Sequence, residues 1–466
     1  MSDQLSHIKS SESSGRIFLS VLLPTLNEAE SMRLLLPRLV ETLNASGCRY
    51  EILVVDGNSR DGTCEVVEKF TRNLLPEQVK GMEGCRVIKQ ELPGYGEALK
   101  AGFAQFKGDF LATMDADLSH HPGVITDMIA VAQVSQAEMV IGSRFIRGGG
   151  TEAPFFRAFL SRILNKFFRS SLGLPYLDLS SGFRLYKRSA LKSLNFESGG
   201  YEILEEILVK FHIQGYRIVE APFRYRPRRH GQSHARIFAF GIRYLKLLPS
   251  LRRLRIGAEV ADHEERAYFS RNLVQRWWRR RRFEGILKNS IDFGRILDLG
   301  CGSDLLVDVL PNSIGIDLNL AKLRYKRAPG RRLIQGDGCF LPFYNESFDQ
   351  IIGCHILEHI DALAQEDFLR EIARVLKPKG RLILCLPLFG SLSWKLIRKI
   401  HSLRTPSEST EPYFREIALE RLVEELNKRD IWLKKKVIPC PGEVLMVFER
   451  GGRITPTKDL INKNLR

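Results

Sequence analysis

The stretch Phe110-Leu-Ala-Thr-Met-Asp-Ala-Asp-Leu-Ser-His-His-Pro122 decides how the first half of the chain is interpreted. Its apolar start, residues 110–114, predicts a short buried strand that ends at the carboxylates of Asp115 and Asp117. Carboxylates at positions i and i+2 beyond a strand can bind one Mg²⁺ or Mn²⁺ ion, whose other ligands are water and substrate phosphates. Such an ion would neutralise the charge of a departing nucleoside diphosphate. Taken alone, two aspartates more often decorate a turn, so the rest of the chain must decide.

The length and composition predict a globular protein of two domains, and the strands followed by helices described below indicate the α/β class. The chain has 466 residues, more than usually fold around a single hydrophobic core, so two domains are expected. Of these residues 44% are hydrophobic and 27% are charged, which is typical of globular proteins. Its formal net charge of +17 indicates anionic partners: phosphorylated substrates, nucleic acid or an acidic membrane surface. Residues 1–15 lack the apolar core of a signal peptide, and no window of about 18 apolar residues predicts a membrane-spanning helix.

The cysteines give no indication of a metal site or a disulfide framework. They stand at positions 48, 64, 85, 301, 339, 354, 385 and 440. None of them forms a Cys-x-x-Cys motif, the spacing typical of zinc sites. Free cysteines fit a reducing compartment, so we expect a cytoplasmic protein that is bound to a membrane at most peripherally.

Segments before residue 110 also read as strands that run into helices. Residues 16–24 are largely apolar and precede Thr25-Leu-Asn-Glu28 at the start of a helical pattern. Residues 50–55 predict a strand that ends at Asp56, the position where open α/β sheets bind ligands. Residues 94–102 add a glycine-bearing loop, which is a weak signal by itself.

In this order and spacing, the motifs resemble family 2 glycosyltransferases of the dolichyl-phosphate or polyprenyl-phosphate mannosyltransferase type. The resemblance covers roughly residues 17–240 and rests on many ordered matches. They are Pro24–Glu28, Val55–Thr63, Met114–Pro122, Ile141–Arg144, Ser161 and Arg162 with Asn165, Ser181–Tyr186, Gly200 and Tyr201 with Glu206, Pro222–Tyr225, and Arg228–Ser233. The resemblance implies a GT-A nucleotide-sugar-binding fold whose product is a polyprenyl-phosphate sugar, formed with inversion.

The resemblance also implies roles for individual residues. The nucleotide sugar would be bound by Pro24, Leu26, Glu28, Asp56 and Asp115. The catalytic set would be Asp115 and Asp117, which hold the metal ion, and Arg144, Arg162 and Arg228, which bind phosphates. A lipid phosphate is already an anionic nucleophile, so transfer needs oriented arginines more than a strong base. Because Gly57 and Leu26 depart from residues common in the family, the donor stays open between GDP-mannose and a UDP-hexose.

The second half begins with Arg295-Ile-Leu-Asp-Leu-Gly-Cys-Gly302, an apolar strand that runs into glycines. Residues 314–317 predict another strand that ends in Asp317, a carboxylate placed to bind ribose hydroxyls. The loop has Asp304 and no third glycine, which a helix needs to approach a pyrophosphate closely. A cofactor without phosphate therefore suits it better than a nicotinamide dinucleotide.

With the later motifs, these stretches resemble class I S-adenosylmethionine-dependent methyltransferases over roughly residues 285–450. The later motifs are Gly336–Gly338, Phe348 with Asp349, Leu357–Ile360 and Leu376–Gly380. The resemblance implies a Rossmann-like fold that binds S-adenosyl-L-methionine through Asp298, Gly300, Gly302, Asp317, Asp337 and His355. Asp317 would bind the ribose and Asp337 the adenine amino group. His355 follows the fourth strand, where cofactor and substrate meet, although a lone histidine is more often structural.

Basic segments connect the two halves. Residues 236–256 combine apolar and basic side chains, which suits a helix lying in a lipid interface and equally a helix packed on a domain. Residues 257–268 are polar and read as a linker. Residues 276–283, Arg-Trp-Trp-Arg-Arg-Arg-Arg-Phe, could contact a membrane or nucleic acid, but they also resemble the helix before many methyltransferase cores. We expect no nucleic-acid partner.

The sequence thus predicts a bifunctional enzyme. Its parts are a tail (1–15), a GT-A domain ending in a basic amphipathic helix (16–256), a linker with a basic and aromatic helix (257–284), a methyltransferase domain (285–452) and a second tail (453–466). A sugar would pass from a nucleotide sugar to a polyprenyl or dolichyl phosphate at the cytoplasmic face of an anionic membrane, and the second domain would methylate that glycolipid or a related substrate. One alternative is a sugar-hydroxyl acceptor with Glu205 or Glu206 as general base. Another is a second half that only binds a partner.

Overall fold

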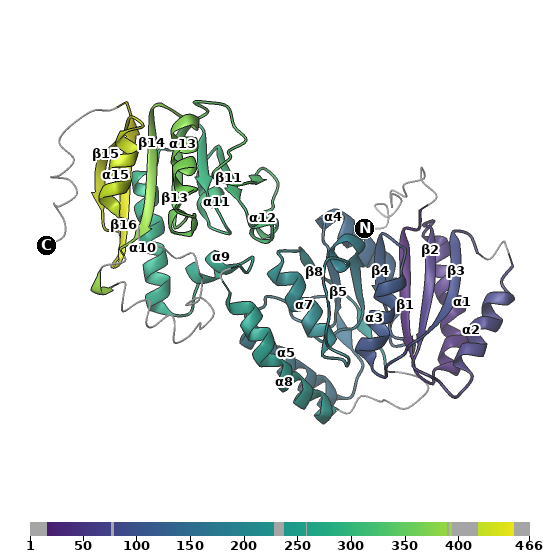
Figure 1. Ribbon diagram of the computed structural model, residues 1–466. Helices are drawn as coiled ribbons and strands as arrows, with labels where there is room; N and C mark the ends of the chain where they lie inside the picture. Colours follow the sequence, from purple (N-terminus) through teal and green to yellow (C-terminus); the bar gives the residue numbers. More distant parts are fainter. Residues whose placement is uncertain are drawn as a thin grey trace. The chain divides into compact units, whose positions relative to one another are not determined.

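The chain folds into two compact units, Met1–Arg255 and Ile256–Arg466, each built around a seven-stranded sheet (Figure 1). The computed structural model describes residues 16–75, 79–227, 237–257, 259–388, 391–393 and 418–451. The predicted two-domain α/β class is confirmed. Of the helices within these ranges, none is both long enough and apolar enough to cross a bilayer.

The sheet of the first unit has the strand order β3-β2-β1-β4-β7-β5-β8. Its strands are β1 (Leu19–Thr25), β2 (Tyr50–Asp56), β3 (Met82–Lys89), β4 (Phe110–Thr113), β5 (Met139–Ser143), β7 (Arg184–Lys187) and β8 (Ile218–Pro222). Only β7 runs against its neighbours in this sheet. The carboxyl ends of β1, β2 and β4 therefore lie at one edge.

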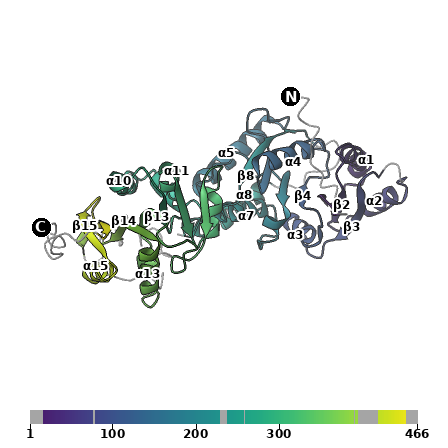
Figure 2. The same ribbon diagram turned by 90° about the horizontal axis from the view of Figure 1, so that it is seen from above.

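Helices cover both faces of this sheet (Figure 2). They are α1 (Ala29–Ala45), α2 (Thr63–Arg72), α3 (Tyr95–Gln105), α4 (Val124–Ser135), α5 (Phe155–Leu172), α6 (Arg188–Leu191), α7 (Ile203–Ile213) and α8 (Ile237–Ile256). Apolar side chains of α1 and α4, such as Leu36 and Met128, fill the core on one face. Leu99 of α3 and Ile207 of α7 belong to the core on the other. A short ribbon, β6 (Gly150–Thr151) with β9 (Arg224–Tyr225), stands apart from the sheet.

For helix α8, the sequence allowed either a position in a lipid interface or packing on a domain. The structure shows it packed on the first unit. Leu248 and Leu251 are buried in the core that also contains α3 and α7. Arg255 is 2% exposed and donates hydrogen bonds to the carbonyls of Leu172 and Gly173 at the end of α5. A cation at this position satisfies carbonyls that lack partners within α5 and complements the helix dipole.

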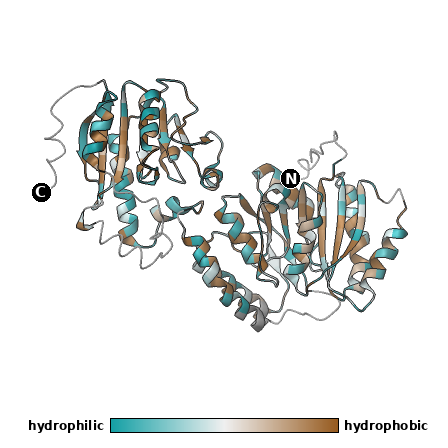
Figure 3. Ribbon diagram, in the orientation of Figure 1, coloured by the Kyte–Doolittle hydropathy of each residue, from teal (hydrophilic) through white to brown (hydrophobic). Residues whose placement is uncertain are grey.

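The sheet of the second unit has the order β12-β11-β10-β13-β14-β16-β15. Its strands are β10 (Ile296–Leu299), β11 (Ser313–Asp317), β12 (Arg332–Gln335), β13 (Phe348–Cys354), β14 (Leu376–Pro387), β15 (Ile431–Val437) and β16 (Glu443–Arg450). Strand β16 lies antiparallel between β14 and β15, and the other pairs are parallel. The central strands of both sheets are largely hydrophobic (Figure 3). Polar chemistry is therefore concentrated beyond the strand ends.

Two groups of helices cover the second sheet. They are α9 (His263–Tyr268), α10 (Leu273–Asn289), α11 (Leu306–Val309), α12 (Leu320–Lys326), α13 (Gln365–Val375) and α15 (Leu419–Asn427). Phe368 of α13 and Leu422 of α15 pack in one core. Ile286 of α10 and Leu306 of α11 pack in the other.

The segment predicted to be a linker and a basic-aromatic helix belongs to this second unit. In α10, Arg282 forms an ion pair of 3.0 Å with Glu443, and Trp278 Nε1 donates to the carbonyl of Pro441 at 3.1 Å. These contacts favour the domain-packing interpretation of this helix. The stretch read as a polar linker contains helix α9, because Glu264 and Glu265 find cationic partners in α12.

Candidate functional sites

A cavity of about 250 Å³ opens beside the carboxyl end of β4. Asp115, Asp117 and Arg144 form part of its polar wall. The apolar wall comes largely from α5, whose lining residues include Ala158, Leu160, Leu164 and Phe168. The cavity therefore joins two carboxylates and a guanidinium to an apolar channel wall.

The acidic pair is held in a fixed turn. Asp117 is 4% exposed and accepts a hydrogen bond from the backbone N–H of Ser119 at 3.0 Å, whereas the Asp115 side chain is 39% exposed. His120 Nδ1 accepts from the backbone N–H of Asp115 at 3.1 Å, and its ring stacks on Phe183. Burial lowers the pKa of His120 to about 4, so the ring is neutral and positions the turn. Two carboxylates facing a cavity suit a hard cation such as Mg²⁺ or Mn²⁺.

Of the residues expected to bind the nucleotide, Asp115 lines this cavity, whereas Pro24, Leu26, Glu28 and Asp56 lie along the same sheet edge outside its lining. Pro24 pairs in register with Val55, the residue before Asp56. Asp56 is 2% exposed, and its carboxylate accepts hydrogen bonds from Ser59 N and Oγ at 2.9 and 2.5 Å. Leu26 is 40% exposed, and Glu28 accepts from Ser31 Oγ at 2.8 Å.

The three arginines have different surroundings. Arg144 is clamped by Asp178, whose carboxylate accepts from Nε and Nη2 at 2.7 and 2.6 Å. Arg162 is exposed on α5 and lies over the ring of Phe145, beside Arg144. Arg228 lies outside the described residues. The structure therefore brings Arg144 to the acidic pair, in an orientation fixed by Asp178.

Asp178 was not singled out from the sequence. It is fully buried and also receives Arg144 through the backbone N–H at 3.0 Å. Its partner Arg144 lies 34 residues away in the sequence, so no local pattern could reveal the contact. The one sequence signal for Asp178 was its position just before the Ser181–Tyr186 motif.

The structure separates Glu205 from Glu206. Glu206 accepts hydrogen bonds from Glu197 N, Ser198 N and Lys210 Nζ, and these lower its pKa although burial opposes them. Glu205 lines the cavity at 2% exposure, and burial raises its pKa to about 8. Glu206 is thus a structural anchor, and Glu205 is protonated at neutral pH.

In the second unit, the residues expected to bind S-adenosyl-L-methionine lie at or just beyond the carboxyl ends of the parallel strands β10, β11, β12 and β13. Gly300 and Gly302 have φ of +67° and +50°, a conformation that favours glycine. A Cβ on Gly300 would meet Ile356 at 2.8 Å. Asp317 accepts from the backbone N–H of Gly302 at 2.8 Å, which ties the end of β11 to this loop.

Asp298 supports a ligand at this loop. It is 2% exposed, and its Oδ2 has no hydrogen-bond partner among the described residues. Burial raises its pKa well above the usual range. Asp337 is exposed, with Oδ1 accepting from the backbone N–H of Cys339 at 2.9 Å. An orphaned buried carboxyl group beside a glycine cradle fits a polar, phosphate-free cofactor.

Glu264 of α9 is a contact that sequence reasoning missed. Its carboxylate accepts from Ser303 N and Oγ, next to Gly302, and from Lys322 Nζ at 2.7 Å. Although burial opposes it, Lys322 lowers the pKa of Glu264 to about 2. The sequence showed acidic residues in the predicted linker, but it could not show that their cationic partners, Lys322 and Lys326, lie in α12.

His355 is placed in a buried ionic network. Its Nε2 lies 2.9 Å from Glu443 and its Nδ1 lies 2.9 Å from Glu358, and both carboxylates are fully buried. Although burial opposes them, Glu443 and Glu358 raise the pKa of His355 to about 10. Cys354 and Cys385 lie beside it.

Comparison with known proteins assigns a family to each unit. Residues 20–194 match the glycosyl transferase family 2 domain, and residues 297–384 match a methyltransferase domain. The chain therefore contains a glycosyl transferase family 2 domain followed by a methyltransferase domain, as the resemblances implied.

Two curated relatives are similar to the first half. A dolichol-phosphate mannosyltransferase of Pyrococcus furiosus is 33% identical over 219 residues, which are 46% of this chain and 58% of that protein. An undecaprenyl-phosphate 4-deoxy-4-formamido-L-arabinose transferase of Edwardsiella ictaluri is 29% identical over 219 residues, 46% of this chain and 62% of that protein. The chain thus spans about three fifths of each relative.

Among solved structures, a SAM-dependent methyltransferase of Thermotoga maritima, described as a possible histamine N-methyltransferase, is 20% identical with a TM-score of 0.32. The match covers 41% of this chain and 99% of that one.

The raised pKa of Glu205 predicts a pH-dependent stability. Because the folded chain favours the protonated form of Glu205, this group contributes its full stability below the ordinary pKa of 4.5. The contribution is lost as the pH rises through the raised pKa of about 8, where the buried carboxyl group must ionise. Glu205→Gln should therefore raise the melting temperature more at pH 8.5 than at pH 5, by about 5 °C or more. Thermal unfolding followed by circular dichroism at both pH values measures the difference. Glu206→Gln is the control and should lower the melting temperature at both pH values, because it removes the ion pair with Lys210. Equal shifts in melting temperature for Glu205→Gln at the two pH values would contradict the prediction.

Proposed function

We propose that this chain, with its glycosyl transferase family 2 domain and its methyltransferase domain, is a bifunctional enzyme of lipid-linked sugar synthesis. The first domain transfers a sugar from a nucleotide sugar, GDP-mannose or a UDP-hexose, to a polyprenyl phosphate. The second domain methylates the resulting glycolipid or a related substrate of the same pathway. The names of both curated relatives contain a polyprenyl phosphate, which supports this acceptor.

The observation that carries the proposal is the mixed character of the cavity. One wall has Asp115, Asp117 and Arg144, and the other consists largely of apolar side chains of α5. A phosphate with an apolar tail meets both walls, because its head needs cationic donors and its tail needs apolar surface. A hydrophilic sugar acceptor would leave the apolar wall uncovered.

Protonation also favours a phosphate acceptor over a sugar hydroxyl. A hydroxyl needs a general base, and Glu205, the glutamate that lines the cavity, is protonated at neutral pH. A phosphate is anionic at that pH and needs orientation, which Arg144 provides from its fixed position on Asp178. A bound Mg²⁺ or Mn²⁺ would supply neutralisation of the leaving diphosphate, with Asp115 and Asp117 as its protein ligands.

In the second domain, the residues fit S-adenosyl-L-methionine, which would supply an activated methyl group. Gly300 and Gly302 let the cofactor approach the backbone, and Asp298 offers a carboxyl group with an unused oxygen. Asp317 would bind ribose hydroxyls and Asp337 the adenine edge.

Peripheral contact with an anionic membrane is supported by an apolar stripe on α5. Phe155, Phe159, Ile163 and Phe167 are four residues apart and 85%, 51%, 47% and 45% exposed. Such spacing places them on one face of the helix. Exposed basic side chains flank the stripe, as expected for a helix that rests on acidic lipids. We infer that the enzyme acts at the cytoplasmic face of the membrane.

The transfer reaction tests the first domain. Asp117→Asn should lower transfer of radiolabelled sugar from GDP-mannose or UDP-glucose to polyprenyl phosphate by about 100-fold or more in Mg²⁺ or Mn²⁺, because a metal ligand is lost. Asp109→Asn is a matched control, since Asp109 lies at the opposite end of β4 and pairs with Arg16. Undiminished transfer by Asp117→Asn would exclude this site. Loss of transfer in Glu205→Gln would favour the sugar-hydroxyl alternative.

Calorimetric titration tests the second domain. S-adenosyl-L-methionine should bind the full-length chain, and Asp317→Ala should weaken binding about 10-fold or more by removing the ribose ligand. Glu366→Gln, 70% exposed on α13, should leave the affinity unchanged. The absence of heat at millimolar cofactor would show that the second half is a binding module.

Vesicle sedimentation tests the membrane contact. The double change Phe155→Ser and Phe159→Ser should reduce binding to vesicles with acidic phospholipid several-fold, because two exposed aromatic side chains no longer enter the interface. Val134→Ser is the control, since Val134 is 90% exposed on α4, a different helix. Equal sedimentation of the double variant and the unaltered chain would rule out the α5 stripe as the contact.

A further inference from the structure

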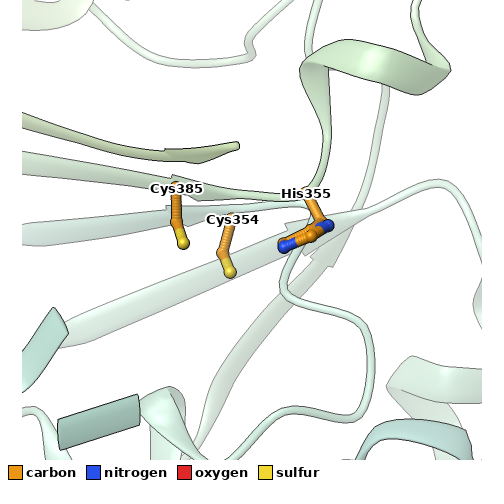
Figure 4. Close-up of side chains that lie close together, drawn as sticks. All are labelled: Cys354, His355 and Cys385. Carbon is orange, nitrogen blue, oxygen red and sulfur yellow. The ribbon is translucent and has the colours of Figure 1, made fainter. Parts of the chain in front are cut away.

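Three soft or borderline ligands meet at the carboxyl ends of β13 and β14. Cys354 and Cys385 are register partners on these adjacent parallel strands, so their side chains project to the same face (Figure 4). His355 follows Cys354 with φ of +52°, and its backbone N–H donates to the carbonyl of Cys385 at 2.9 Å. This left-handed turn sets the imidazole beside the two thiols (Figure 4). One ligand atom from each residue lies within 4.8 Å of the other two.

We propose that Cys354, His355 and Cys385, completed by Glu443, form a binding site for a zinc-class divalent cation in the methyltransferase domain. The proposal is independent of the sugar-transfer and methyl-transfer reactions. Two thiolates, an imidazole and a carboxylate are a donor set that zinc accepts in four-coordinate sites.

Glu443 supplies the fourth ligand from β16. Its Oε1 lies 2.9 Å from His355 Nε2, and its Oε2 lies 3.9 Å from Cys385 Sγ. Ligand atoms of one tetrahedral zinc ion lie about 3.3–3.8 Å apart, so the four groups need to shift by about 1 Å to enclose an ion. Cys440 Sγ, 3.2 Å from Glu443 Oε2, is a neighbouring thiol that orients this carboxylate.

Glu358 completes the site from behind His355. It is fully buried, and its carboxylate has no hydrogen-bond partner among the described residues besides its ion pair with His355 Nδ1. A histidine that binds metal typically donates its other ring N–H to a carboxylate, which fixes the tautomer. Glu358 on Nδ1 leaves Nε2 for the ion, on the side where Glu443 lies.

Charges around the site balance when the ion is bound. Two thiolates, Glu443 and Glu358 carry four negative charges. Against these stand two charges on the ion, one on Arg282, which pairs with Glu443 at 3.0 Å, and one on Arg279, which also interacts electrostatically with Glu443. Binding replaces the proton on His355 Nε2 and releases one proton from each thiol. Without an ion, the same residues form an ionic network of Arg282, Glu443, His355 and Glu358, to which Cys385 adds only a weak thiol contact with Glu443.

Metal analysis of the full-length chain, purified under reducing conditions without chelator, tests the proposal. We expect about one zinc ion per chain, and Cys354→Ser with Cys385→Ser should remove it. Cys339→Ser is the matched control, because Cys339 is a buried free cysteine of the same domain outside the cluster, and it should keep the ion.

Cobalt substitution identifies the ligands. Co²⁺ alone should give a thiolate charge-transfer band that the double serine variant lacks; binding at Asp115 and Asp117 cannot produce this band, because oxygen ligands have no sulfur transition. Addition of Zn²⁺ to the metal-free chain should raise its melting temperature, and the folded double variant should not respond. A metal-free chain with neither a cobalt band nor a melting shift would overturn the site in favour of the ionic network. Zinc retained by the double variant would also overturn the site. So would the finding that Cys354 and Cys385 form a disulfide without reductant but bind no metal ion when reduced.

Discussion

Parallel pairing of the central strands is the constraint on which both candidate sites depend. In the first unit β1 pairs with β4, and in the second β10 pairs with β13, so segments far apart in the sequence end at one edge. The strands themselves are largely buried and mostly apolar, which drives their association. The carboxylates that face the two candidate sites, such as Asp115, Asp117 and Asp317, lie where these strands stop or just beyond, and Asp298 lies one residue before the end of β10. The location of function in each unit is therefore a consequence of how its core is stabilised.

The sequence predicted the features that depend on neighbouring residues. An apolar run followed by Asp115 and Asp117 is a local pattern, and the structure places both carboxylates in the wall of a cavity. The left-handed glycines 300 and 302 are local as well. Asp178 on Arg144 and Glu264 on Ser303 could not be found in this way, because each contact joins segments that only the folded chain brings together. The nucleotide residues Pro24, Leu26, Glu28 and Asp56 share the predicted edge, and their roles remain predictions.

Two histidines show why residue type alone does not give a role. His120 is buried and His355 half-buried, each just beyond a strand end, yet their pKa values move in opposite directions. Burial dominates for His120, whereas two carboxylates outweigh burial for His355. The same is true of the cysteines, because their spacing along the chain gave no indication that Cys354 and Cys385 lie together. Strand register, which joins Cys354 to Cys385, is invisible to a search for short motifs.

Helices α9 and α10 change where the second domain begins. The recognisable methyltransferase motifs start at residue 297, but Ile286 of α10 fills one of the two cores and Glu264 of α9 is hydrogen-bonded to the glycine loop. A fragment cut at the first motif would expose an apolar sheet face and leave Lys322 without its carboxylate. The folded unit therefore includes these N-terminal helices, and a fragment that keeps every methyltransferase motif but begins at residue 297 lacks part of a hydrophobic core.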